Sequence, residues 1–476
     1  MVSEKIIKRS LQSGMIVLSA VGLQTLIRFA TQVALARMLE PVHFGVLAFA
    51  SLVAMFFNNF TNIHGDKYII KEKEDAHQKL DNAFTLELLL SIIFIVFVVS
   101  IAPLLMKILG KPDLTIFVQF LSISFLYNPL GKPRSLLEKE LSFFKAKFPW
   151  VLAQLVGGIV GVTLAYYNFG IWSLLWWRIS TLGMEIVIIW LVAPYRPKLA
   201  FNKSIIQGVL GFGWPLLGSS VLVFVYSNID YYFVGYLLGE EQLGYYWLAF
   251  QTSHYFLNIR DAINSVVLPA ITKMDNETEI NSTFNKLTAI TALIYIYPTI
   301  IILFYGGELI EIVFGEKWIP ATTAFQIFMV LTTLRAMTSY WDPILLYTGK
   351  TMIQLYMTIY RVVMVSIFVY YLSRAYGING AATGVFIANI TGIILMAIVI
   401  KKYVMKLNYK VFSIIFANIL ILLVTYIGVV ALTDISAIYN MIIILSILSI
   451  ITYYQIRKNL DRTVLSWILG KRIKSN

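Results

Sequence analysis

The chain has 476 residues, of which 59% are hydrophobic and only 13% are charged, and its mean hydropathy is +0.77. This composition excludes a water-soluble protein of this size and is typical of an integral membrane protein. The chain contains no cysteine, which excludes disulfides and thiolate metal sites, and its four histidines lack the spacing of metal ligands, so we expect no metal.

Stretches of roughly 20 apolar residues, enough to cross a bilayer core about 30 Å thick, recur along almost the whole chain. The first stretch lacks a signal-peptide cleavage site and is expected to remain as a helix. The pattern predicts an all-α membrane protein with about fourteen transmembrane helices. In chain order we expect them at residues 12–35, 43–63, 81–108, 114–131, 148–168, 171–193, 213–238, 243–269, 286–311, 318–340, 351–373, 378–401, 410–432 and 437–456.

The net charge of +13 does not indicate a nucleic-acid partner, because most of the basic residues fall on alternate loops between the expected helices. Basic residues concentrate on the cytoplasmic side of membrane proteins. The charge pattern therefore predicts a multi-pass protein of the inner (plasma) membrane with both termini in the cytoplasm. The connections on the other side are too short to form an external domain.

Two pairs of short motifs suggest an internal repeat. Residues 39–45 (LEPVHFG) resemble residues 238–244 (LGEEQLG), and residues 169–172 (FGIW) resemble residues 376–379 (YGIN). Both pairs lie at equivalent positions of two sets of six helices, as in transporters built from parallel repeats. We predict an N-terminal lobe at 1–204, a C-terminal lobe at 205–405, and a two-helix addition with a basic tail at 406–476.

Polar residues inside the expected helices indicate a cationic cavity. Arg28 lies in the middle of the first helix with Gln24 and Gln32 four residues to either side, so the three share one helical face. Arginine at membrane depth usually faces a cavity, and its forked donors suit phosphate. A phosphate or diphosphate headgroup is the expected ligand. The residues predicted to bind it are Arg28, Gln24, Gln32, Asn59, Asn258, Arg260, Arg335 and Arg361.

Alternatives stay open for several of these residues. A single polar side chain can serve as a hydrogen bond between helices, and Arg178 and Arg260 can be interfacial. Asp230, Asp261 and His254 are the candidates for coupling to H⁺ or Na⁺. The plainer interpretations are an interfacial aspartate at 230 and a buried, hydrogen-bonded histidine at 254.

The chain resembles the Wzx-type O-antigen and polysaccharide flippases, in the polysaccharide-transporter branch of the multidrug/oligosaccharidyl-lipid/polysaccharide (MOP) exporter superfamily. The resemblance rests on residues 37–45 (RMLEPVHFG), similar to an R-x-L-G-P-x-x-F-G signature with Glu40 in place of glycine, on residues 230–239 (DYYFVGYLLG) and on residues 376–380 (YGING). It implies that the chain moves an undecaprenyl-diphosphate-linked oligosaccharide from the cytoplasmic to the outer leaflet by alternating access. It also implies a monomer without a cofactor, working beside a polysaccharide polymerase and chain-length proteins.

Other functions are expected to differ in recognisable ways. A flippase for lipid II or a teichuronic-type precursor is the nearest alternative, and a multidrug or cation antiporter of the same superfamily would favour carboxylates over arginines. A membrane-embedded glycosyltransferase or polymerase would need a large external loop or catalytic acids. There is no phosphate-binding glycine loop, so ATP is not the expected energy source.

Overall fold

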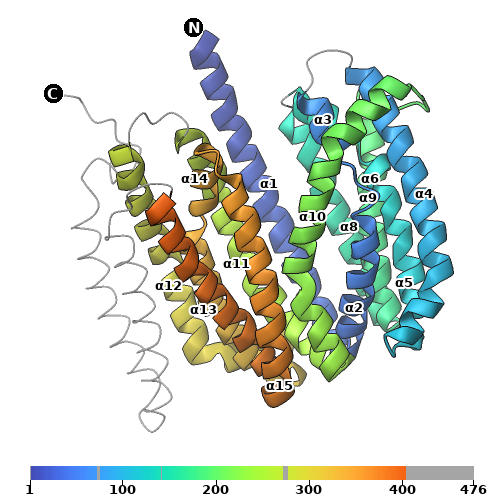
Figure 1. Ribbon diagram of the computed structural model, residues 1–476. Coiled ribbons are helices and arrows are strands. Elements are labelled where there is room, and N and C mark those ends of the chain that lie inside the picture. Colours follow the sequence, from blue (N-terminus) through green and yellow to red (C-terminus); the bar gives the residue numbers. More distant parts are fainter. Residues whose placement is uncertain (1, 72–75, 141, 272–276, 404–476) are drawn as a thin grey trace. The chain divides into compact units, whose positions relative to one another are not determined.

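The computed structural model describes residues 2–71, 76–140, 142–271 and 277–403, and every regular element in these residues is helical (Figure 1). In chain order the elements are α1 (Val2–Met38), α2 (Pro41–Asn58), α3 (Gly65–Lys71), α4 (Ala76–Ile108), η1 (Pro112–Leu114), α5 (Thr115–Ser122), η2 (Ile123–Leu126), α6 (Tyr127–Leu130), α7 (Pro133–Lys139), α8 (Phe143–Tyr166), α9 (Ile171–Val192), α10 (Lys203–Leu238), α11 (Glu240–Ile271), α12 (Glu277–Phe314), η3 (Glu316–Ala321), α13 (Thr322–Thr338), α14 (Trp341–Tyr347) and α15 (Thr351–Tyr403).

The all-α prediction is confirmed for the described residues, and each helix expected between residues 12 and 401 overlaps an observed helix. Within the described part of the chain, eight helical stretches are long and apolar enough to cross a membrane: Pro41–Asn58, Ala76–Ile108, Pro112–Lys139, Phe144–Tyr166, Ile171–Val192, Lys203–Leu238, Thr283–Phe314 and Thr351–Tyr403. The chain is therefore a multi-pass membrane protein. The helices expected at 410–432 and 437–456 lie outside the described residues, so the total of fourteen stays a prediction.

The chain divides into two compact units. Unit 1 comprises Met1–Trp247, Val313–Trp318 and Val369–Ala381, and unit 2 comprises Leu248–Ile312, Ile319–Phe368 and Ala382–Asn476. These units are groups of mutually packed segments and do not test the expected lobes at 1–204 and 205–405, which stay a prediction.

Small residues set the packing of the long helices in unit 1. A Cβ atom at Gly157 of α8 would lie 2.9 Å from the backbone nitrogen of Thr181 on α9, and one at Gly161 would lie 2.7 Å from the Cβ of Trp177. Close helix approach through small residues is the usual packing mode in membranes, because lipid tails provide no hydrophobic drive for helices to associate. In Figure 1 these helices run side by side, with the short α3 at one end of unit 1.

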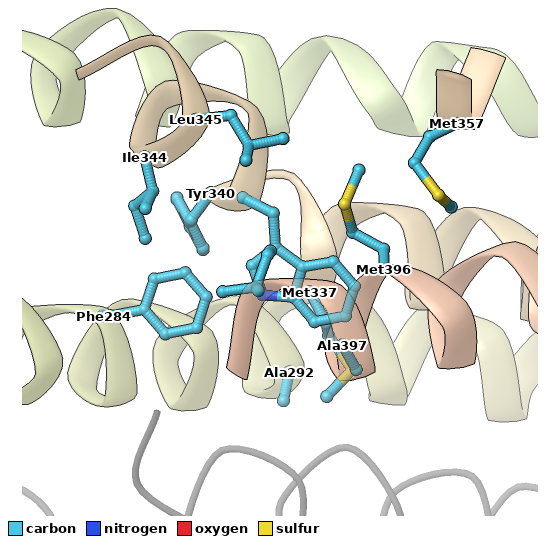
Figure 2. Packing of buried hydrophobic residues seen from close by; sticks show 11 residues of the cluster. Phe284, Ala292, Met337, Tyr340, Ile344, Leu345, Met357, Met396 and Ala397 are labelled. Atoms are coloured by element: carbon cyan, nitrogen blue, oxygen red, sulfur yellow. The ribbon is translucent and has the colours of Figure 1, made fainter. Parts of the chain in front are cut away.

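Unit 2 has a core of aromatic, methionine and aliphatic side chains from α12, α13, α14 and α15 (Figure 2). The buried members are Phe284, Ala292, Met337, Tyr340, Trp341, Ile344, Leu345, Met357, Met396, Ala397 and Ile400. Phe284 and Tyr340 pack edge to face with 6.0 Å between ring centroids. Methionine fills irregular gaps between such rings.

One of the two repeated motifs has the same backbone conformation in both copies. Gly170, before α9, has φ 56° and ψ −130°, and Gly377, at a break inside α15, has φ 59° and ψ −142°. Positive φ favours glycine because it has no Cβ. This agreement supports the internal repeat, and the break divides α15 at the place where the sequence predicted two helices.

The other motif pair explains the unusual Glu40. Its φ of −79° is open to any residue, whereas Gly239, the matching residue before α11, has φ 88° and requires glycine. Glu40 and His43 form a reciprocal capping box at the start of α2. The glutamate side chain therefore accepts a hydrogen bond from a free backbone N–H at the start of α2, and its own backbone conformation is unstrained.

Candidate functional site

The polar face predicted on the first helix is present on α1. Gln24 and Gln32 are buried, with 6% and 1% of their surfaces exposed, while the Arg28 side chain between them is exposed. Arg28 is thus the accessible member of the face, and the two amides flank it one helical turn away on either side.

A second arginine of unit 1 is close enough to Arg28 to sense its charge. Arg178 of α9 lies within electrostatic range of Arg28, and its Nη1 donates to Ser51 Oγ of α2 over 3.5 Å. Like charges held close together repel, and an anion placed between them removes that repulsion. Arg178 is not among the binding residues predicted from the sequence.

A buried carboxylate belongs to the same region of unit 1. Asp230 of α10 is 4% exposed, and its Oδ2 accepts a 2.7 Å hydrogen bond from the hydroxyl of Tyr246 on α11. The neighbouring Tyr231 lies within electrostatic range of Arg28 and packs edge to face on Tyr246, with ring centroids 5.6 Å apart. We call Arg28, Arg178, Asp230, Tyr231 and Tyr246 the unit 1 cluster.

The three charges lie at similar distances from the ends of their helices. At 1.5 Å per residue, Arg28 lies about 15 Å before the end of α1, Arg178 about 10 Å after the start of α9, and Asp230 about 12 Å before the end of α10. In the predicted topology all three helix ends face the external side. In that topology, a bilayer core about 30 Å thick has the cluster near its middle, where charge is costly.

Unit 2 contains the other predicted arginines, and each faces a polar neighbour. Arg335 of α13 donates from Nε and Nη2 to the Oδ1 of Asn389, over 3.1 and 3.0 Å. Arg260 and Arg361 both lie within electrostatic range of Asp342. Arg361, in the part of α15 before the break at Gly377, also packs against the part after it, since a Cβ at Gly392 would lie 3.2 Å from its Nε.

Two other predicted residues, Asn59 and His254, have partners close to them in the sequence. Asn59 donates back to the carbonyl of Met55 over 2.8 Å at the end of α2. His254 is exposed and stacks on Phe250, with 5.4 Å between ring centroids. Asn258 and Asp261 lie on α11, but their side chains are outside the described part of the structure.

Two intramembrane carboxylates were missed by the sequence interpretation. Glu87 of α4 is completely buried and lies 2.8 Å from Nζ of Lys132, which is 5% exposed. Glu185 of α9 is buried and pairs with Arg134 of α7, while accepting a 3.0 Å hydrogen bond from Tyr127. A carboxylate in a hydrophobic span was a usable signal.

Relatives of known description match most of the chain. Lipopolysaccharide biosynthesis protein WzxC of Escherichia coli (strain K12) is 24% identical over 381 residues, covering 79% of this chain and 77% of its own. Succinoglycan biosynthesis transport protein ExoT of Rhizobium meliloti (strain 1021) is 22% identical, covering 61% and 60%. Teichuronic acid biosynthesis protein TuaB of Bacillus subtilis (strain 168) is 23% identical, covering 60% and 61%.

Solved structures share the fold. The lipid II flippase MurJ in an inward closed conformation superposes with a TM-score of 0.72 at 14% identity, covering 94% of this chain and all (100%) of that one. An inward-facing multidrug resistance MATE family transporter of the MOP superfamily superposes with a TM-score of 0.58 at 18% identity, covering 82% and 99%. The expected MOP exporter fold is thus found at the level of architecture.

A family model described as "Polysaccharide biosynthesis protein" matches residues 34–323, from the end of α1 to the start of α13. Because this match covers more than half of the sequence, the chain belongs to the polysaccharide biosynthesis protein family.

Proposed function

We propose that the protein is a flippase that moves an undecaprenyl-diphosphate-linked oligosaccharide from the cytoplasmic to the outer leaflet by alternating access. Family membership, the fold shared with a lipid II flippase and the relative described as a succinoglycan biosynthesis transport protein support this function. The protein acts as a transporter and not as an enzyme.

The observation that carries the proposal is the pair Arg28 and Arg178 of the unit 1 cluster, two arginines of apolar helices that lie within electrostatic range of each other. A diphosphate offers several charged oxygens, so one headgroup can accept hydrogen bonds from both guanidinium groups and relieve their mutual repulsion. Gln24 and Gln32 then provide neutral donors and acceptors for the adjoining sugar. An organic cation would meet repulsion from the same two arginines, which argues against a multidrug or cation antiporter.

In unit 2 we assign Arg335, Arg260 and Arg361 to the binding of an anionic headgroup as well. Asn389 holds the guanidinium of Arg335 in one orientation, which lowers the entropic cost of binding a ligand. Asn59 and Asn258 complete the proposed binding residues. Lipid II or a teichuronic-type precursor would use the same headgroup chemistry, so it remains the alternative substrate.

The energy source in this proposal is an H⁺ or Na⁺ gradient that acts through Asp230. This carboxylate is buried, and the Tyr246 hydroxyl donates to it, so its charge state is tied to the packing of α10 and α11. Asp261 and His254 are the further candidates.

We propose that the protein works as a monomer in the inner membrane, with both termini in the cytoplasm and beside a polysaccharide polymerase.

The test measures glycan export in a deletion strain that carries each variant at matched membrane abundance. We expect Arg28→Ala and Arg178→Ala each to lower export roughly tenfold or more, as expected for loss of one charge-assisted contact worth about 1.5–3 kcal/mol. Arg28→Lys keeps the charge but loses the fork, so it should retain part of the activity. Arg374→Ala, which removes an exposed arginine stacked on Tyr370, is the matched control.

Export at the parent rate in both Arg28→Ala and Arg178→Ala would reject the headgroup role of this pair. The class of cargo is read from the lipid that accumulates in the deletion strain. Accumulation of lipid II in place of a polysaccharide repeat unit would select the alternative substrate.

A further inference from the structure

The two turns matched as repeats in the sequence lie directly against each other in unit 1. A Cβ atom at Gly45 of α2 would overlap the carbonyl oxygen of Glu240 and would lie 2.9 Å from the backbone nitrogen of Gly244. A Cβ atom at Gly244 of α11 would overlap the carbonyl oxygen of Pro41 and would lie 3.2 Å from its Cα. Neither position has room for any side chain.

The contact is reciprocal. In the repeat, Gly45 corresponds to Gly244 and Pro41 corresponds to Glu240, since both pairs are separated by the same number of residues. Each glycine therefore meets the first helical residue of the other copy. This is the contact pattern of a two-fold axis, in which residue i touches j and the equivalent of j touches the equivalent of i.

Side chains around the two glycines add ring contacts and ion pairs near the starts of α2 and α11. Phe44 is completely buried, with its ring 5.3 Å from that of Trp247 and 5.2 Å from that of Trp318. Two ion pairs bridge the region, Lys111 to Glu240 at 2.5 Å and Lys317 to Glu40 at 3.5 Å. In the predicted topology these residues form the external end of unit 1, between the unit 1 cluster and the outside.

We propose that this reciprocal contact of Gly45 and Gly244 closes the transport pathway on the external side, and that the two turns separate when the pathway opens outward. The inference rests on the proposed transport function, because alternating access requires one side to be closed while the other is open. The two helix starts meet backbone to backbone, so no side-chain rotation can loosen them gradually. Such a contact is either made or broken, as expected of a two-state element.

The first test uses the absence of cysteine from the chain. A single reporter, Gln32→Cys, lies below the contact on the buried face of α1 and is labelled with a membrane-impermeant maleimide added to either side. We expect Gly45→Ala and Gly244→Ala each to raise the rate of labelling from the external side roughly tenfold or more, because a Cβ there excludes the closed state and shifts the population to the open one.

The matched control is Gly183→Ala on α9, where an added Cβ meets nothing within 4 Å. It should label at the parent rate. Unchanged labelling in both Gly45→Ala and Gly244→Ala, at parent abundance, would overturn the proposal. This readout needs no substrate, so it tests the closure independently of the cargo. The proposed cargo is tested separately, by glycan export and lipid accumulation in strains that carry the native Gln32, Gly45 and Gly244.

A second measurement keeps both native glycines. It tests whether the two turns separate during transport even if the alanine variants fail to accumulate. Lys111→Cys and Glu240→Cys together replace the ion pair that bridges the two repeats, and a short bifunctional thiosulfonate links the two thiols reversibly. We expect the link to abolish glycan export and a reducing agent to restore it. Export at the unlinked rate by fully cross-linked protein would show that these turns do not separate.

Discussion

At the scale of single residues, Glu87 and Lys132 form a buried ion pair in unit 1, and burying both charges costs desolvation free energy. Lys132 immediately precedes α7, and Glu87 also accepts a 3.2 Å hydrogen bond from the backbone nitrogen of Gly65 at the start of α3. Two buried charges stabilise a fold only together, because each compensates the desolvation of the other. The pair therefore joins three helices at the predicted cytoplasmic end of unit 1.

Removing one partner of this pair should destabilise the protein more than removing both. For Lys132→Met we expect a loss of about 3–5 kcal/mol, because Glu87 is left as an uncompensated buried charge. The double variant Glu87→Leu with Lys132→Met should recover most of this loss. Thermal unfolding in detergent measures both. A double variant less stable than Lys132→Met would contradict the argument, and Lys139→Met, farther along α7, serves as a comparison.

Individual charges show where prediction from the sequence succeeds and where it stops. Arg28 could be predicted as a functional residue because charge in an apolar span is visible in one helix alone. The partnership of Lys132 with Glu87 could not, since their contact joins segments far apart in the chain. For the same reason Arg178 fitted an interfacial position until the fold brought it within electrostatic range of Arg28.

At the scale of elements, α10 is held to the segment that leads into α3. A Cβ at Gly213 would overlap the carbonyl oxygen of Ile63, and one at Gly208 would lie 2.8 Å from the hydroxyl of Tyr68. His64, between these contacts, has φ 54°, in the left-handed region that few side chains adopt. The hydrophobic pattern predicted α10 from residue 213 onward but missed its start at Lys203, and it gave no sign of α3 or of this attachment, because these depend on long-range packing.

The attachment of α10 should weaken in acid through His64. Partial burial and the charge of Lys67 lower the pKa of His64, and Lys132 acts in the same direction, against Asp66 and the Leu216 carbonyl. A histidine whose folded-state pKa is depressed stabilises the fold fully above its unfolded pKa of about 6.5, and that stability is lost as pH falls below it.

We therefore expect the melting temperature to fall less between pH 7.5 and 5.5 in His64→Asn than in the parent. Asparagine tolerates the left-handed conformation and does not titrate. Asp66 contributes little in this window: burial raises its pKa, but the charge and hydrogen bond of Lys132 outweigh burial and lower it below the usual value. Identical pH profiles for variant and parent would exclude His64 as the source.

At the scale of the whole molecule, one architecture serves different cargoes. The fold is shared with a lipid II flippase and with a multidrug transporter, so the helix arrangement alone does not select the substrate. Hydropathy predicted most of this architecture, since spans of about 20 residues follow from bilayer thickness. Cargo and coupling depend on which charges meet inside the membrane, and for unit 1 those are Arg28, Arg178 and Asp230.

If Asp230 couples transport to an ion gradient, the rate of lipid movement in the variant Asp230→Asn should no longer depend on that gradient. The amide keeps the size of the side chain and can still accept the hydrogen bond from Tyr246, so packing between α10 and α11 is preserved. In proteoliposomes that contain a polyprenyl-diphosphate-linked sugar, we expect the parent to move the lipid faster when a proton or sodium gradient is imposed. The variant should move it at the same rate with and without that gradient.

Tyr246→Phe is the companion variant, because it removes the hydroxyl but leaves the carboxylate able to exchange a cation. It should keep its response to the gradient, with the response displaced to a different pH or sodium concentration, since the hydroxyl no longer stabilises the charged carboxylate. A gradient response in Asp230→Asn equal to that of the parent would remove Asp230 from the coupling step. The driving force would then have to act on a group other than the carboxylate of the unit 1 cluster.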